Sequence, residues 1–484
     1  MRHAIVFAAL LLLLPIAARS APIEQAATHP EKADGDSLIR EHQGFWLGDL
    51  TFPNGHSVKV GLELFTRADG SVWASYASPG RGSYDIPVDR ISETGGSVDL
   101  DLSFASMKLS WTGDHFSGQW KQNGDTMPVE LRPVAAFPRK HRIQTPTPPF
   151  PYHDQTLAIA SVKGVTLGAT LTVPNGTKRP DLVVLVHGSG PQTRDEEGDG
   201  HATFAVLADQ LARRGLAVLR YDKRGISRST GDYEASTPKD LADDLTAVAQ
   251  AMRARRQFAR VGLVGHSEGP MIAAAVAARH PESVDFIVSL AGVGLPGVDM
   301  MLLQDRAYAK DQGAGPADAE RLLRYARRYY ETIVQIDDPD TRVSTLKKLR
   351  EGLPADDRAL IAKYKMNEGS LSLENAASPE LRALLMSNPQ KDWRAVRCPV
   401  LALNGDLDHQ VPVESLGGIV AALHAGGNGK VESAVLPGIN HMFQTARTGT
   451  EEEYSTIDET VAPVVASRIA AFVQGQVDSS VSRD

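Results

Sequence analysis

The chain has 484 residues, of which 42% are hydrophobic and 23% are charged. This is an ordinary globular composition, and the length predicts two or three domains or one large domain with additions. The formal net charge of −8 is mild for this size, so the sequence shows neither the basic surface that nucleic acid requires nor a polybasic patch for a membrane.

The N-terminus has the pattern of a secretory signal peptide. Arg2 precedes an apolar run over residues 4–18, and the small residues Ser20 and Ala21 follow it. A run of this length suits a signal peptide and is short for a membrane span, which needs about 20 residues. We therefore predict a signal peptide over 1–20 and no membrane span after its cleavage, with an uncleaved anchor as the alternative.

Cys398 is the single cysteine, so the chain can form no internal disulfide and no cysteine-based metal site. We interpret it as a small buried hydrophobic residue at the start of a strand. Export combined with the absence of internal disulfides predicts a periplasmic or secreted bacterial protein.

An antiparallel β domain is predicted over residues 43–134, after a flexible, polar lead-in over 21–42. Apolar residues alternate with polar ones, as in the stretch 58–64, and Asp69-Gly70 marks a hairpin turn. We expect a sandwich or a partly closed barrel. Its tryptophans could bind sugar or lipid, but we expect them in the core; they are Trp46, Trp73, Trp111 and Trp120.

A linker over 135–154, stiffened by the proline-rich residues 144–151, precedes a second domain over 155–475. There, short apolar strands alternate with helical patterns. The stretch 182–186 is nearly unbroken Val and Leu, which is typical of a strand covered on both faces. The alternation predicts an α/β fold, with a mostly parallel sheet flanked by helices.

Two segments depart from this alternation. Residues 296–392 carry a charged, helical pattern with no strand, so we predict that they form a helical cap inserted between two strands of the sheet. Residues 476–484 are predicted to be a C-terminal tail.

Ser267 is the candidate nucleophile. It is flanked by Gly265 and Gly269, and it lies between a predicted strand and an alanine-rich helix. This strand–turn–helix context is what a nucleophile elbow requires, and a Cβ at either glycine is expected to clash with a neighbouring strand or helix. A serine hydroxyl alone is a poor nucleophile near neutral pH, so it also needs a base, an orienting acid and an oxyanion hole.

Two later strands end in residues that can activate the serine. Strand 399–404 is followed by Asp406 and Asp408, and strand 431–436 is followed by His441. The order serine, acid, histidine suits a nucleophile elbow, and successive strand ends converge at one sheet edge. We assign His441 as the base; either aspartate could orient it, and either could instead form a turn.

The oxyanion hole is expected in the loop His187-Gly188-Ser189-Gly190-Pro191, directly after a strand. Its small residues let backbone N–H groups approach a substrate oxygen, and we predict the donors to be the N–H groups of Ser189 and Glu268. The alternative is a phosphate-binding loop, but the Lys-Ser/Thr ending that such a loop needs is missing. No metal or cofactor is predicted.

These stretches resemble the α/β-hydrolase superfamily, and within it the exported bacterial branch near the serine aminopeptidase and dienelactone hydrolase groups. The resemblance covers about 155–475, and it implies Ser267 as nucleophile, Asp408 rather than Asp406 as acid, and His441 as base. In relatives, the segment that matches 221–229 usually reads D-x-R-G-x-G-x-S; here Ser227 replaces the second glycine. The likeness rests on HGSGPQTRDE (187–196), YDKRGISRSTG (221–231), GHSEG (265–269), NGDLDHQVP (404–412) and PGINHMFQ (437–444).

We therefore predict an α/β-hydrolase fold and a serine hydrolase that cleaves a small carboxylic ester through an acyl-enzyme intermediate. The second hypothesis is an aminopeptidase-type enzyme with the same triad, acting on short peptides. It would need a carboxylate for the substrate's ammonium group, which Glu268 or an acidic cap residue could provide. The third is a non-catalytic binding protein on a hydrolase scaffold. We expect no nucleic-acid partner, and no motif indicates an oligomeric state.

Overall fold

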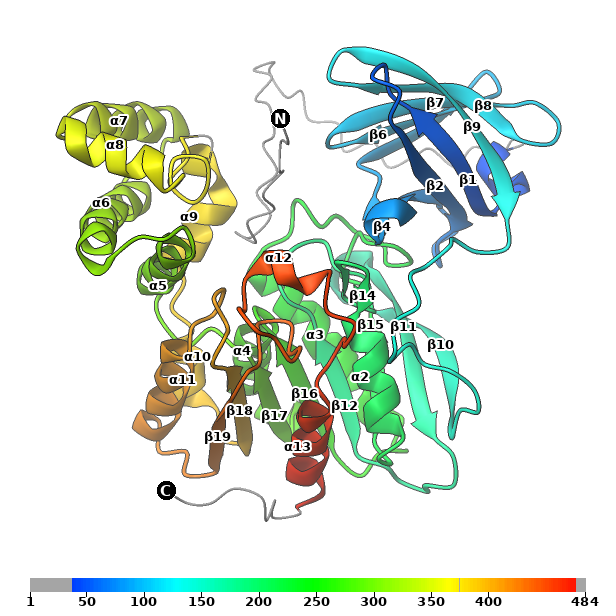
Figure 1. The fold of residues 1–484 in the computed structure, drawn as a ribbon. Coiled ribbons are helices and arrows are strands. Elements are labelled where there is room, and N and C mark those ends of the chain that lie inside the picture. Colours follow the sequence, from blue (N-terminus) through cyan, green and yellow to red (C-terminus); the bar gives the residue numbers. More distant parts are fainter. Residues whose placement is uncertain (1–36, 374, 476–484) are drawn as a thin grey trace.

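The computed structural model describes residues 37–373 and 375–475, which form a β domain, a larger α/β domain and a helical cap (Figure 1). The predicted signal peptide, most of the lead-in and the C-terminal tail lie outside the described residues. Inside the predicted lead-in, helix α1 (Leu38–Glu41) is capped by the Ser37 side chain, and Ile39 is buried in the core of the β domain. This contact with the core holds the last residues of the lead-in against the sheet.

The β domain is one nine-stranded antiparallel sheet in the order β4-β3-β2-β1-β9-β8-β7-β6-β5. Alternate side chains point into a shared core, as in β6, where Val98, Leu100 and Leu102 are buried. The strands are β1 (Gly44–Thr51), β2 (Ser57–Thr66), β3 (Val72–Ser78), β4 (Ser83–Pro87), β5 (Arg90–Thr94), β6 (Ser97–Leu102), β7 (Ala105–Trp111), β8 (Phe116–Gln122) and β9 (Asp125–Val134).

The four tryptophans of the β domain divide into two pairs. Trp46 and Trp120 are buried in the core, as expected. Trp111 is partly buried and packs against the core, where its ring stacks on that of His42. Trp73 is also partly buried, and the guanidinium of Arg67 lies 4.0 Å from the centroid of its ring.

The α/β domain contains a mixed eight-stranded sheet in the order β10-β11-β15-β12-β16-β17-β18-β19. Strand β11 pairs antiparallel with both of its neighbours, and the strands from β15 to β19 are parallel. The strands are β10 (Tyr152–Ala160), β11 (Thr166–Pro174), β12 (Leu182–Val186), β15 (Ala217–Tyr221), β16 (Val261–His266), β17 (Phe286–Leu290), β18 (Val400–Gly405) and β19 (Val431–Leu436). This is the mostly parallel sheet that the sequence predicts, although β10 begins at Tyr152, inside the predicted linker, because its pairing with β11 extends that far.

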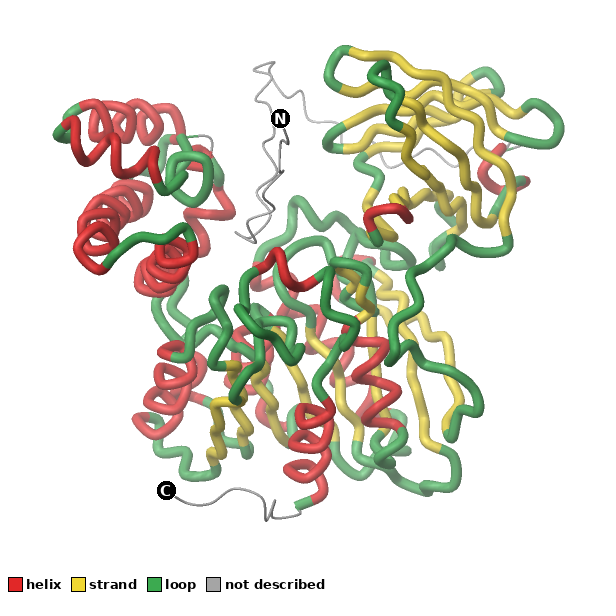
Figure 2. Tube along the Cα trace, viewed as in Figure 1, coloured by secondary structure: helices red, strands yellow, loops and turns green. Residues whose placement is uncertain are grey.

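Helices cover both faces of this sheet (Figure 1). Helices α2 (Thr203–Ala212) and α13 (Pro463–Gln474) pack on one face. The helices on the other face are α3 (Pro238–Ala254), α4 (Gly269–Arg279), α10 (Gln390–Ala395) and α11 (Glu414–Ala425). Loops gather at the edge of the sheet that faces the cap and the β domain (Figure 2). Three short elements interrupt these loops: β13 (Glu197–Gly198), β14 (His201–Ala202) and α12 (Glu451–Tyr454).

In the described residues between β17 and α10, the cap contains five α-helices, and it has a hydrophobic core of its own. Its helices are α5 (Gly297–Asp311), α6 (Pro316–Gln335), α7 (Pro339–Glu351), α8 (Ala355–Lys363) and α9 (Pro379–Met386). The cap ends earlier than the predicted residue 392, because α10 belongs to the α/β domain. Trp393 of α10 is buried in the core beside the sheet, and its indole N–H donates to the carbonyl of Val293 at 3.2 Å.

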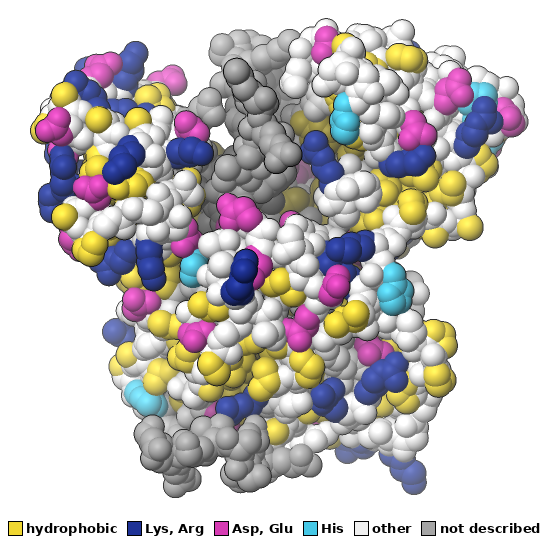
Figure 3. Space-filling model, viewed as in Figure 1, with side chains coloured by type: hydrophobic (Ala, Val, Ile, Leu, Met, Phe, Trp, Pro, Cys, Tyr) yellow, Lys and Arg dark blue, Asp and Glu magenta, His cyan; other side chains and the backbone are white. Residues whose placement is uncertain are grey.

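The visible surface carries acidic and basic side chains interspersed over the cap and the β domain (Figure 3). Among the described residues, no helix has both the length and the apolar character that crossing a bilayer would require.

A buried ion pair joins the loop after β15 to helix α3. The Arg224 guanidinium donates to both carboxylate oxygens of Asp244, at 2.7 and 2.8 Å, and both residues are buried. We expect Asp244→Ala to lower the free energy of unfolding by about 3 kcal/mol, because it removes both close hydrogen bonds to a carboxylate and leaves the buried Arg224 charge only the longer ion pair with Asp240 at 3.6 Å.

Urea denaturation would measure this loss, with Asp243→Ala as the matched control. Asp243 directly precedes Asp244 on the same helix and forms a more exposed ion pair with Lys239. Removing the Asp243 carboxylate is therefore expected to lower the free energy of unfolding by less than about 1 kcal/mol. Equal losses for the two variants would contradict a structural role for the buried pair.

Candidate active site

Ser267 lies in a sharp turn between the end of β16 and the start of α4. Its φ angle is +57°, in the left-handed region that residues with a Cβ rarely adopt. The turn is tight because a Cβ at Gly265 would overlap the backbone of Gly269 and Pro270, and a Cβ at Gly269 would overlap the carbonyl oxygen of Val186. The two glycines therefore allow the strained turn that presents the serine at the edge of the sheet.

Three loops bring the predicted serine, histidine and aspartate into one hydrogen-bonded line. The Nε2 atom of His441, on the loop after β19, lies 3.2 Å from Ser267 Oγ. The Nδ1 atom of the same ring lies 3.0 and 3.1 Å from the two carboxylate oxygens of Asp408, which follows β18. These distances allow His441 to accept the serine proton while Asp408 orients the imidazole.

Asp408 is held as a buried carboxylate by its own loop. It accepts hydrogen bonds from the backbone N–H groups of Gln410, at 3.0 Å, and Val411, at 2.8 Å. The side chain of Asn404 adds a longer contact of 3.4 Å. Asp406 points elsewhere, because it accepts from the N–H of Gly438 at 2.6 Å and so ties the loop after β18 to the loop after β19.

The predicted oxyanion loop lies against the nucleophile. A Cβ built on Gly188 would be 3.2 Å from the Cβ of Ser267. Over the described part of the chain, the backbone N–H groups of Ser189 and Glu268 donate to no protein acceptor. They are the two N–H groups that the sequence predicts as oxyanion donors, and both are free to donate to a substrate oxygen.

Two buried charged residues, Lys223 and Glu196, form hydrogen bonds with the backbone of the oxyanion loop. The sequence analysis assigned a role to neither of them. The ammonium of Lys223 donates to the carbonyl oxygens of Gly188, at 2.6 Å, and Gly190, at 2.9 Å. On the other side, the Glu196 carboxylate accepts from the N–H of Gly188 at 2.6 Å. Both residues belong to stretches that resemble the superfamily, but only the folded chain shows what they hold.

His266 links this loop to the nucleophile strand. Its Nδ1 atom forms an ion pair with Glu196 at 3.2 Å, and its Nε2 atom lies 3.0 Å from the carbonyl of His441. Burial disfavours the charged imidazole, but the adjacent Glu196 carboxylate outweighs it and raises the pKa of His266. Burial also tends to raise the pKa of Glu196, yet the His266 charge lowers it overall, so both partners favour their charged forms.

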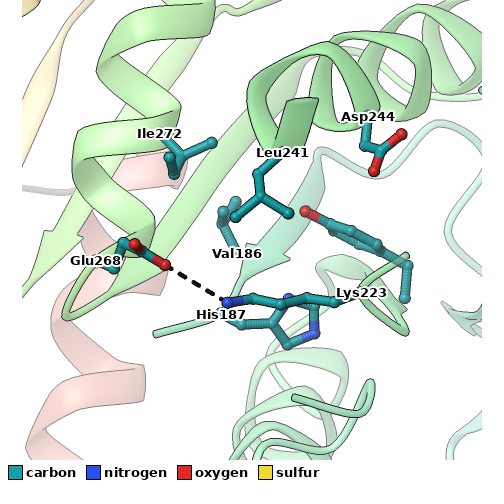
Figure 4. A pocket seen from close by; sticks show the side chains of 8 residues that line it. Val186, His187, Lys223, Leu241, Asp244, Glu268 and Ile272 are labelled. Atoms are coloured by element: carbon teal, nitrogen blue, oxygen red, sulfur yellow. Dashed lines mark hydrogen bonds and ion pairs between the residues drawn. The ribbon is translucent and has the colours of Figure 1, made fainter. Parts of the chain in front are cut away.

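Glu268, directly after the nucleophile, contacts Lys223, and both side chains line a small cavity (Figure 4). Its carboxylate is 3.5 Å from the ammonium nitrogen of Lys223. Burial lowers the pKa of Lys223, while the carboxylates of Glu268 and Glu196 act in the opposite direction. The cavity measures about 10 Å³, which is space for about one water molecule.

Among the described residues, no group of three or more His, Cys, Asp or Glu side chains is placed to hold a metal ion. The arrangement instead offers a polarised hydroxyl, a proton acceptor and two backbone donors at one edge of the sheet, which together can carry out acyl transfer.

A serine on a strand–turn–helix elbow, with its acid and histidine on later strand ends, is the arrangement found in α/β hydrolases. A family model described as serine aminopeptidase, S33, matches residues 178–445, which is more than half of the chain. The chain therefore belongs to this family of serine hydrolases within the α/β-hydrolase superfamily.

Esterase EstD of Thermotoga maritima is a curated relative, 31% identical over 135 residues. That match covers 28% of this chain and 32% of the relative, so the chain spans about a third of the length of EstD.

Several solved structures are similar at low sequence identity. The esterase Pf2001 of Pyrococcus furiosus is 16% identical with a TM-score of 0.40, covering 70% of this chain and 96% of that one. Est1E of Butyrivibrio proteoclasticus, with ferulic acid bound, is 16% identical with a TM-score of 0.40 over 66% and 98% of the two chains. A proline iminopeptidase of Mycobacterium smegmatis is 17% identical, with a TM-score of 0.40 over 66% and 98%.

The elbow geometry predicts that Gly269→Ala is damaging. The added methyl group would overlap the Val186 carbonyl, so we expect it to lower the free energy of unfolding by about 2 kcal/mol and to displace Ser267. Gly417→Ala, in the exposed part of helix α11 with open space at its Cβ, is the matched control and should raise stability by about 0.5–1 kcal/mol. Thermal and urea unfolding of both variants would test this, and a Gly269→Ala protein as stable as the wild type would contradict it.

Proposed function

We propose that the protein is a carboxylic ester hydrolase that works through an acyl-enzyme formed on Ser267. The observation that carries the proposal is the line of contacts from Ser267 to His441 at 3.2 Å and from His441 to Asp408 at 3.0 Å. This line ends at a serine held in a strained turn, beside two backbone N–H groups that have no protein acceptor in the described chain.

In the first half of the proposed reaction, Ser267 Oγ attacks the ester carbonyl carbon and His441 Nε2 takes the hydroxyl proton. The carbonyl oxygen becomes an oxyanion, which the N–H groups of Ser189 and Glu268 stabilise. The tetrahedral intermediate then collapses, the bond to the alcohol oxygen breaks, and His441 returns the proton to the leaving alcohol. Asp408 holds the ring in the required tautomer and stabilises its positive charge throughout.

In the second half, water attacks the acyl-enzyme with His441 again as the base. The bond between the acyl carbon and Ser267 Oγ breaks, the serine regains its proton from His441, and the carboxylic acid leaves. Each oxyanion donor of this kind contributes about 3–4 kcal/mol to transition-state stabilisation, so the position of the oxyanion loop matters as much as the base.

Two observations favour an ester over a peptide substrate. The curated relative that matches this chain is named as an esterase. In addition, an aminopeptidase needs a carboxylate for the substrate's ammonium group, and Glu268, the candidate nearest to the nucleophile in the sequence, already pairs with Lys223 at 3.5 Å. A carboxylate neutralised in this way binds a second cation weakly.

The family description keeps the peptidase as the second candidate. Turnover of p-nitrophenyl acyl esters and of aminoacyl p-nitroanilides by the same preparation would separate the two. A kcat/KM for the anilides above that for the esters would reject the ester proposal.

Ser267→Ala is expected to lower kcat for p-nitrophenyl esters by about 10⁴-fold or more, because the nucleophile is removed. The variant should also lose labelling by a fluorophosphonate probe, while a metal chelator should leave wild-type activity unchanged. Ser110→Ala, on an exposed position of β7, is the control and should keep full activity. Retention of ester hydrolysis by the Ser267→Ala protein would reject the assignment.

The two aspartates after β18 can be distinguished by matched substitutions. Asp408→Asn should lower kcat by about 10⁴-fold, because an amide can favour the wrong imidazole tautomer and cannot stabilise the imidazolium. Asp406→Asn keeps an oxygen that can accept from Gly438 and should cost less than about tenfold. Steady-state kinetics would measure both, and a larger loss for Asp406→Asn would exchange the roles of the two residues.

A further inference from the structure

The segment 222–229, here called the Lys223 loop, lies between the β domain and the oxyanion loop. At its start, Lys223 holds two carbonyl oxygens of the oxyanion loop. Asp222 accepts hydrogen bonds from the backbone and side chain of Arg194, at 2.8 and 2.6 Å, and from the N–H of Arg228 at 3.2 Å. The position of Lys223, and through it that of the oxyanion loop, therefore depends on how the rest of this segment is held.

The Lys223 loop contains a residue in an unfavourable backbone conformation. Ser227 has a φ of +44°, in the left-handed region, where a Cβ crowds the following carbonyl oxygen. A glycine would adopt this conformation without that cost. The surrounding structure must therefore hold Ser227 in place.

Arg67 of the β domain supplies that support. It follows the end of β2, and its guanidinium donates to the carbonyl oxygens of Ser227, at 3.0 Å, and Gly225, at 2.9 Å. Arg67 is buried, with an exposed fraction of 6%, and it lies over the ring of Trp73. Its donors are therefore fixed in direction before they reach the loop.

A second contact between the same two elements strengthens this attachment. Arg228 forms an ion pair with Glu63 of β2, and its guanidinium lies 3.8 Å from the centroid of the Phe65 ring. Strand β2 and Arg67, the residue directly after it, thus hold the Lys223 loop at Gly225, Ser227 and Arg228.

We propose that the N-terminal β domain, which contributes no residue to the catalytic triad, positions the oxyanion loop of the α/β domain, with Arg67 as the positioning residue. By holding the strained backbone at Ser227, Arg67 keeps Lys223 against the oxyanion loop, so that the N–H groups of Ser189 and Glu268 stay aligned with each other. The effect on turnover rests on the proposed ester hydrolysis; the effect on loop order does not.

The kinetic test uses the full-length protein with Arg67→Ala, Ser227→Gly and the double variant. Arg67→Ala should lower kcat for a p-nitrophenyl ester by about tenfold with KM changed less than about twofold, because oxyanion donors that are misplaced by a fraction of an ångström lose transition-state contacts. In the Ser227→Gly background the same substitution should cost less than about threefold, since glycine needs no support at positive φ.

Matched variants separate this effect from a general loss of folding. Arg90→Ala, in the β domain but in an exposed pair with Asp101, should leave kcat unchanged. Arg67→Lys keeps the charge without the planar fork, so it should fold and still lose kcat. An equal loss in kcat with and without Ser227→Gly would overturn the role of the strained residue.

Hydrogen exchange followed by mass spectrometry provides a readout that requires no activity. Arg67→Ala should speed exchange in peptides that cover 187–196 and 222–231 and leave a peptide over β19 unchanged. Unchanged exchange in both loop segments would overturn the proposal, even if the protein hydrolyses esters. A wild-type protein that neither hydrolyses esters nor reacts with a fluorophosphonate would reject the proposed function, while faster loop exchange in the variant would still support the attachment by Arg67.

Discussion

The close packing of Gly269 on the carbonyl end of β12 is the constraint on which the rest of the site depends. Helix α4 begins directly against Val186, and no side chain fits between them. Since β12 continues into the oxyanion loop, this contact sets the distance between the loop and Ser267. The nucleophile and the groups that receive the developing charge are thereby placed by one backbone contact, before any substrate arrives.

Buried charges then hold the loop from both sides. Lys223 binds its carbonyl oxygens and Glu196 binds the N–H of Gly188, while His266 pairs with Glu196 beneath the nucleophile. Burying such charges is unfavourable unless they have compensating partners, and each of these three residues has an ion-pair partner and at least one hydrogen bond. The loop cannot shift without breaking hydrogen bonds to buried charged side chains, so the backbone N–H groups of the oxyanion hole are held before substrate binds.

Both additions to the α/β domain touch loops that carry site residues. From the cap, Asp311 of α5 pairs with His409 at 2.8 Å, and Gln304 donates to the carbonyl of Gln410 at 2.6 Å. These contacts lie on the loop that holds Asp408. From the β domain, Arg67 reaches the loop that holds Lys223. The cap is thus attached to the acid side of the site and the β domain to the oxyanion side.

The sequence by itself determined the strands at 182–186 and 431–436 and the elbow at Ser267, because hydrophobic periodicity and turn chemistry act over a few neighbouring residues. The order in which the acid and the histidine follow the serine can be read directly along the chain. Residue order alone did not separate Asp406 from Asp408, a choice that came from the family resemblance. The predicted end of the cap at residue 392 was too late, and the sequence left open whether the β domain is one sheet or two. Only the tertiary structure decided these points. It also revealed the contacts made by Lys223, Glu196, His266 and Arg67. The pairing of Arg67 with Ser227 joins residues 160 positions apart, and such pairings depend on how whole domains and sheet edges meet, which no local pattern of side chains records.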